Sequence, residues 1–170
     1  MVIIITGATH TGKTLLAQRL LERHHYPCLS IDLLKMGLIR SGNTSLTPYD
    51  DARLESYLWP IVREMIKTAV ENRQSLIVEG GYIPHDWKES FEEKYLREIR
   101  YICLVMSKDY ILRHFAQIQK YADVVEKRIS DDGCTIPYLI KENARYQHFC
   151  ELHGYRYLFI DKGYHLDVDL

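Results

Sequence analysis

The chain of 170 residues is long enough for one domain with a single hydrophobic core. Hydrophobic residues make up 46% of the sequence and charged residues 26%, as in ordinary globular proteins. The formal net charge of −1 excludes a generally basic surface, so we expect neither nucleic acid nor an anionic membrane as a partner.

The four cysteines show no spacing typical of a metal site or a redox motif. No two form a CxxC pair, and Cys28 and Cys103 lie in apolar, strand-like runs where packing is the expected role. Free buried thiols of this kind suit a reducing compartment. The apolar run from Met1 to Ile5 is too short for a signal peptide or a membrane-spanning helix. We therefore expect a cytoplasmic protein.

Short apolar strands alternate with amphipathic helices along the chain. The predicted strands are 2–6, 28–31, 75–78, 99–106 and 156–160. The predicted helices are 13–23, 54–70, 109–119 and 136–153. Pro60 must either kink the second helix or begin a new one, Ser107 is a candidate cap for the third, and Gly154 ends the fourth.

This alternation predicts an α/β protein with a parallel sheet covered by helices on both faces. Right-handed crossovers then bring the carboxyl ends of the strands to one edge, where ligands bind in such sheets. The informative residues therefore follow each strand. They are 7–14, Asp32, 79–82, 107–109 and Asp161.

A phosphate-binding loop is the most specific motif in the sequence. It reads Gly7-Ala8-Thr9-His10-Thr11-Gly12-Lys13-Thr14 and matches GxxxxGK[ST] in full. The glycines let the backbone N–H groups point at phosphate oxygens, and the following helix presents its positive end to the same anion. Lys13 is predicted to contact the β- and γ-phosphates, and the Thr14 hydroxyl to ligate Mg²⁺.

Signatures of other P-loop proteins do not accompany this loop. A GTPase reads guanine through an NKxD segment, and the nearest match, Ser107-Lys108-Asp109, has the wrong spacing. No DxxG follows the third strand, where the sequence is Val78-Glu79-Gly80-Gly81. The extra signatures of motor and transporter ATPases are absent as well. These absences favour a small kinase.

The chain resembles the nucleoside-monophosphate-kinase-like branch of P-loop proteins in its length and in the P-loop after its first strand. The segment 76–81 is similar to 2-phosphoglycerate-kinase-like and zeta-toxin-like members, whereas adenylate kinases show a DGFPR-like segment where this chain has 79–84. The resemblance implies one domain over 1–170, a three-layer α/β/α sandwich with a five-stranded parallel sheet ordered 2-3-1-4-5. It also implies an acceptor-handling residue after strand two, matched by Asp32, and an acidic residue near the metal, matched by Glu79.

Two carboxylates are candidates for catalysis and metal binding. Asp32 could accept the proton of the acceptor hydroxyl, or it could cap a helix that begins at Leu33. Glu79 could hold Mg²⁺, or it could be a solvated strand end.

A polar, aperiodic segment over 120–135 is predicted to be a loop or lid. Phosphoryl transfer needs cations near the transferred group, and each candidate could equally be a surface charge. The candidates are Arg113, Lys120, Lys127, Arg128 and Arg145. The pair Lys127-Arg128 fits the position of a lid cation, and Arg128 is the predicted catalytic arginine.

The leading hypothesis is an ATP- and Mg²⁺-dependent phosphotransferase that acts on a small molecule. Lys13, Asp32 and Arg128 are the predicted catalytic residues, and Thr14 and Glu79 the predicted metal ligands. The alternatives are a nucleotide or nucleoside kinase, and a non-catalytic nucleotide-binding module that signals to a partner. The sequence identifies neither the acceptor nor the oligomeric state.

Overall fold

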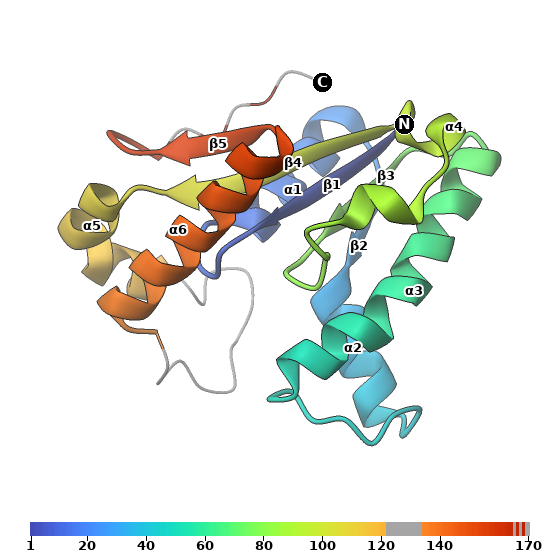
Figure 1. The fold of residues 1–170 in the computed structure, drawn as a ribbon, viewed down its shortest axis with the longest axis horizontal. Helices are drawn as coiled ribbons and strands as arrows, with labels where there is room; N and C mark the ends of the chain where they lie inside the picture. The colour runs from blue at the N-terminus through green and yellow to red at the C-terminus, as the bar shows by residue number, and fades with distance from the viewer. Residues whose placement is uncertain (122–133, 165, 167, 169–170) are drawn as a thin grey trace.

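The computed structural model describes residues 1–121, 134–164, 166 and 168, and it shows a parallel sheet between two layers of helices (Figure 1). The strands are β1 (Val2–Gly7), β2 (Cys28–Ser30), β3 (Leu76–Glu79), β4 (Ile99–Met106) and β5 (Tyr157–Ile160). The helices are α1 (Lys13–His24), α2 (Ile31–Arg40), α3 (Asp51–Glu71), η1 (Trp87–Ser90), α4 (Glu93–Leu96), α5 (Lys108–Tyr121) and α6 (Ile136–His153).

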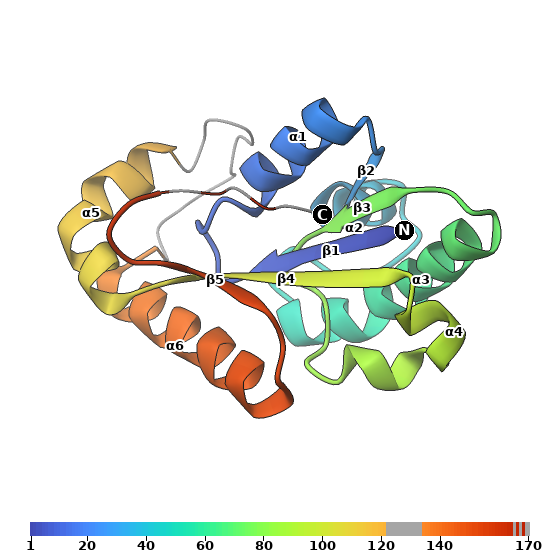
Figure 2. The ribbon, with the colours of Figure 1, turned by 90° about the horizontal axis from the view of Figure 1, so that it is seen from above.

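All five strands pair in parallel, in the order β2-β3-β1-β4-β5. Figure 2 shows α1 on one side of this sheet and α3, α4 and α6 on the other. The predicted three-layer α/β/α sandwich and its strand order are therefore confirmed.

The central strand β1 is buried on both faces, which explains its continuous apolar sequence. Ile3 and Ile5 point into the core that α1 covers. Val2 and Ile4 point into the opposite core, beneath α3. Alternate residues of one strand thus join the two helical layers through the sheet.

Most predicted elements lie within two or three residues of their observed positions, and 99–106 and 136–153 match β4 and α6. The predicted cap of α5 is confirmed, because the backbone N–H of Tyr110 donates to Ser107 Oγ at 2.9 Å. Gly154 ends α6 in the left-handed conformation, also as predicted. α3 runs through Pro60 as a single helix, so no new helix begins there.

Three expectations need correction. Cys28 is exposed rather than packed, because β2 is a short strand at the edge of the sheet. The predicted strand over 28–31 ends at Ser30, and Ile31 already begins α2, two residues before the helix start at Leu33 that was one alternative for Asp32. The short helix α4 was not predicted. The first two residues of the predicted lid over 120–135 belong to α5, and 122–133 lie outside the described residues.

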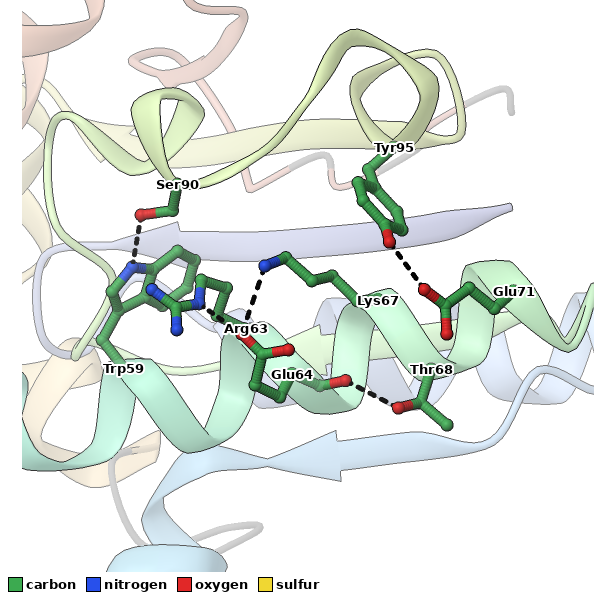
Figure 3. A network of polar contacts seen from close by, with 8 residues as sticks. All are labelled: Trp59, Arg63, Glu64, Lys67, Thr68, Glu71, Ser90 and Tyr95. Carbon is green, nitrogen blue, oxygen red and sulfur yellow. Dashed lines mark hydrogen bonds and ion pairs between the residues drawn. The ribbon is translucent and has the colours of Figure 1, made fainter.

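Polar contacts anchor α3 to the segment between β3 and β4 (Figure 3). The indole N–H of Trp59 donates to Ser90 Oγ at 3.0 Å, and the hydroxyl of Tyr95 donates to Glu71 Oε1 at 2.6 Å. These contacts are spaced along the outer length of α3. They fix the helix whose N-terminal end forms part of the cavity described below.

A buried amide fixes α6 against the carboxyl end of β4. Asn143 is 2% exposed; its Oδ1 accepts from the backbone N–H of Met106 at 2.7 Å, and its Nδ2 donates to Leu139 O at 2.8 Å. The side chain therefore provides hydrogen-bond partners for a backbone N–H at the end of β4 and for a backbone carbonyl of α6.

We expect Asn143→Ala to lower the free energy of unfolding by about 1–3 kcal/mol, because it leaves the buried Met106 N–H without its acceptor. Urea unfolding measures this loss. Gln147→Ala removes an amide of the same helix that bonds Glu151 at the surface, and should change stability by less than about 0.5 kcal/mol. Equal losses in the two variants would contradict the role given to Asn143.

Candidate active site

A cavity of about 1200 Å³ opens where the carboxyl ends of the strands meet. The loop after β1 forms its floor, α2 and the start of α3 form one wall, and α6 forms another. Residues of α5 and Tyr164 complete the lining. The cavity thus lies at the sheet edge that the strand order predicts for a ligand.

The backbone of the predicted P-loop curls where only small residues fit. Gly7 has φ 136°, and a Cβ there would lie 2.3 Å from the carbonyl oxygen of Leu104 on β4. Gly12 has φ 84°, and a Cβ there would lie 1.5 Å from the hydroxyl oxygen of Tyr164. Both positions require glycine, for conformation and for space. His10 also adopts a positive φ, of 64°.

Side chains of the loop bond to its own backbone. Lys13 Nζ donates to the carbonyl oxygens of Gly7 at 3.2 Å and Ala8 at 2.9 Å. The hydroxyl of Thr11 donates to Ala8 O at 2.8 Å. The Lys13 ammonium is therefore held over the mouth of the loop, at the start of α1, where helix dipole and lysine both favour an anion.

The two predicted metal ligands lie side by side. Thr14 Oγ1 donates to Glu79 Oε2 at 3.4 Å, and Glu79 is 2% exposed at the end of β3. A hydroxyl and a carboxylate are oxygen ligands of the type that Mg²⁺ prefers, so this donor set fits the predicted ion. Within the described residues, no group of three or more His, Cys, Asp or Glu side chains could hold a metal by itself.

Asp32 lies in the first turn of α2 and lines the cavity. The helix begins at Ile31 after Ser30, so the alternative that Asp32 caps a helix beginning at Leu33 is wrong. Its carboxylate is 37% exposed and pairs with Lys35 Nζ, whose side chain is 13% exposed.

A chain of polar contacts extends from this pair to α3. Lys35 Nζ also donates to the hydroxyl of Tyr82 at 3.1 Å, and Tyr82 donates to Asp51 Oδ1 at 2.8 Å. Burial, followed by the bond to Asp51, raises the pKa of Tyr82 above its usual range, so the phenol stays protonated. The network connects α2, α3 and the loop after β3, and it fixes Asp32 at the cavity wall.

The opposite wall comes from α6 and the segment after β3. Arg145 pairs with Glu142 at 2.8 Å and lies over the ring of Tyr146. The ring of His85 stacks on Phe149, with centroids 3.4 Å apart. Burial, followed by the charge of Arg145, lowers the pKa of His85, so this imidazole is neutral at pH 7.

The predicted cations have different positions in the structure. Arg145 lines the cavity, whereas Arg113 and Lys120 are exposed on α5 and are not among its lining residues. Lys127 and Arg128 lie outside the described residues, so their role stays a prediction.

Sequence reasoning missed two cations of the cavity wall, Lys35 and Arg40. Both lie on α2. The sequence does contain a signal for this helix, because Ile31, Leu34 and Leu38 follow helical spacing directly after the second strand.

No protein-family model matches this sequence, and no curated protein matches it. Solved structures do. A protein from Chloroflexus aurantiacus J-10-fl described as a candidate kinase is 22% identical with a TM-score of 0.55, over 99% of this chain and 91% of that one. The shikimate kinase of Bacteroides thetaiotaomicron is 16% identical with a TM-score of 0.55, over 94% and 86%. The deoxyadenosine kinase of M. mycoides is 14% identical with a TM-score of 0.57, over 98% and 92%.

The chain has the P-loop NTPase fold of small kinases. At identities of 14% to 22% the similarity is one of fold, and it extends over nearly the whole chain. It agrees with the resemblance to the nucleoside-monophosphate-kinase-like branch inferred from the P-loop. No helix in the described part of the chain is long and apolar enough to cross a membrane.

The contact between Gly12 and Tyr164 generates a stability prediction. Gly12→Ala should cost about 1–2 kcal/mol for its left-handed backbone, and about 1 kcal/mol or more beyond that because the methyl group displaces Tyr164 from its bond to Thr11 O. Gly42→Ala is the matched control, since Gly42 has φ 74° with nothing within 4 Å of the added carbon. Urea unfolding compares the variants, and equal costs would contradict the close contact.

Proposed function

We propose that this protein is an ATP- and Mg²⁺-dependent phosphotransferase that acts on a small-molecule acceptor. The observation that carries the proposal is the meeting of three features at one cavity. The P-loop with Lys13 lies at its floor, Thr14 and Glu79 lie side by side next to the loop, and a carboxylate on α2 faces the same space. A phosphate-binding loop accounts for the first feature alone, whereas phosphoryl transfer requires all three.

The P-loop and Lys13 hold the triphosphate in this proposal. The ammonium of Lys13 exchanges its two loop carbonyls for β- and γ-phosphate oxygens when the nucleotide binds. Thr14 and Glu79 would hold Mg²⁺, which neutralises charge on the phosphate oxygens when bound. Arg128 keeps its predicted role of stabilising the transferred group.

Asp32 acts on the acceptor in this proposal. The acceptor oxygen forms a bond to the γ-phosphorus while the bond from that phosphorus to the bridging oxygen breaks, and ADP leaves. Asp32 accepts the proton that the acceptor hydroxyl loses. Lys35 holds the carboxylate in place and is itself bonded to Tyr82, so the geometry of Asp32 is set before the acceptor binds. A cavity-facing carboxylate of this kind favours an enzyme over a module that only binds nucleotide.

We expect ATP with Mg²⁺ to stabilise the protein, by about 2.7 kcal/mol at a free ATP concentration 100 times the dissociation constant. Lys13→Ala should remove most of that effect, because the ammonium is the main cation at the loop. Thermal unfolding with and without ATP and Mg²⁺ measures it. Lys108 is also the first residue of a helix but does not line the cavity, so Lys108→Ala should keep the wild-type shift. A full shift in Lys13→Ala would sink the assignment of the loop.

We expect Asp32→Asn to retain ATP binding while phosphoryl transfer falls by about 10²–10⁴-fold, as the loss of a general base predicts. ADP formation is measured with an acceptor or, more slowly, with water. Asp109 occupies the same second position in α5 as Asp32 in α2, outside the cavity. Asp109→Asn therefore controls for the helix dipole and should leave turnover unchanged. If the two variants lose turnover equally, Asp32 has no chemical role.

A further inference from the structure

The charges that line the cavity indicate which acceptors it can hold. In the part of the chain that the structure describes, the cations of the lining are Lys13, Lys35, Arg40 and Arg145. The carboxylates of the lining are Asp32, Asp51, Glu55, Glu79 and Glu142. Among the described lining residues, carboxylates thus outnumber cations, although a kinase must also accommodate the negative charge of a triphosphate here.

Two of these four cations are already paired with carboxylates. Lys35 pairs with Asp32, and Arg145 pairs with Glu142 at 2.8 Å. Lys13 belongs to the P-loop and is needed for the nucleotide. The only lining cation left for an acceptor, among the described residues, is Arg40 in the last turn of α2, and it is exposed. One exposed arginine is a weak site for a dianionic phosphate.

Two carboxylates of α3, by contrast, are paired with no cation among the residues that the structure describes. Asp51 accepts a hydrogen bond from Tyr82 but makes no ion pair with any described residue. Glu55, one helical turn further on, is half-buried in the cavity wall and makes neither a hydrogen bond nor an ion pair within the described chain. Burial raises its pKa, and the nearby charge of Arg145 opposes this only in part. A hydrogen-bond donor from a ligand would relieve that cost.

Aromatic rings lie on both walls of the cavity, among the charged side chains. Tyr49, Tyr82, Tyr138 and Tyr146 line the cavity, with Tyr49 81% exposed and Tyr138 45% exposed. Exposed phenol rings pack against sugar or base rings and attract cations through their faces. His85 adds no positive charge, because its ring is neutral at pH 7.

We propose that the acceptor is a hydroxyl compound without a phosphate or carboxylate group, either neutral or positively charged, and that Glu55 and Asp51 receive its hydroxyl or amino groups. A phosphorylated acceptor would place like charges against Asp51 and Glu55, which form no ion pair within the described chain, and this is a strong basis for rejection. This inference rests on the proposed phosphotransferase function and narrows its acceptor to compounds phosphorylated on a hydroxyl.

Matched pairs of acceptors that differ only by a phosphate test the proposal. We would use adenosine with adenosine monophosphate, and glucosamine with glucosamine 6-phosphate, at pH 7.5 with ATP and Mg²⁺. ADP formation above the rate with water measures use of each compound. We expect the phosphate-free member to be used about tenfold or more better in each pair that responds. A preference for the phosphorylated member, or no response to any phosphate-free member, would overturn the proposal.

Variants of α3 then test the carboxylate assigned to this task. Glu55→Gln should weaken the response to glucosamine about tenfold while the thermal shift with ATP stays as in the wild type. Glu64→Gln makes the same change on the same helix at a site that pairs with Arg63 and Lys67 outside the cavity (Figure 3), and should change neither. Equal responses to glucosamine in the two variants would overturn the role of Glu55.

Two further results separate this inference from the proposed function. Loss of the ATP-induced thermal shift in the wild type would refute nucleotide binding and with it the phosphotransferase. An intact ATP shift with a preference for phosphorylated acceptors, abolished by Arg40→Gln, would leave the phosphotransferase standing. It would show that Arg40 binds a phosphate group of the acceptor, and it would refute the proposed preference for phosphate-free acceptors.

Discussion

The contact between the end of β1 and the backbone of β4 is the constraint on which the rest of this structure depends. A side chain at Gly7 would overlap the carbonyl of Leu104, so the residue at which the chain turns away from the sheet must be glycine. That exit directs the P-loop over the strand ends and starts α1 at Lys13. Burial of β1 on both faces keeps this backbone in place, so the core and the proposed phosphate site depend on the same strand.

Three charged residues at this sheet edge are held by partners of the protein itself. Lys13 is held by loop carbonyls, Glu79 contacts Thr14 at the buried end of β3, and Asp32 is held by Lys35. Removing a charge from water is costly unless such partners are present. The site is therefore built before any ligand arrives, and a ligand exchanges existing partners for its own atoms, as preorganised sites do.

The sequence predicted the parts of the molecule whose signal is local. Buried β-branched runs identified β1 and β4, and the P-loop motif identified the loop between β1 and α1, whose role in phosphate binding stays a prediction. It failed where tertiary context decides: Cys28 is apolar in pattern but lies on an edge strand, and α2 begins sooner than the strand signal suggested. Lys35 reaches Tyr82, 47 positions away, and no local pattern shows such a contact. Lys127 and Arg128 lie outside the described residues, so their roles stay predictions.

The two halves of the cavity consequently differ in how much a sequence can reveal. The proposed site for the nucleotide phosphates is one continuous segment whose spacing is fixed by backbone geometry, so a motif is enough to predict it. The acceptor wall is assembled from α2, α3, α6 and the loop after β3, which meet only in the folded chain. Selection there depends on which charges are already paired with each other. Glu55 and Arg145 illustrate this, because both are ionisable residues of the lining, yet only Arg145 is paired with another side chain of the wall. The proposed acceptor preference of this chain therefore follows from which charges of the folded wall are paired with each other, and not from the number of charged residues in the sequence.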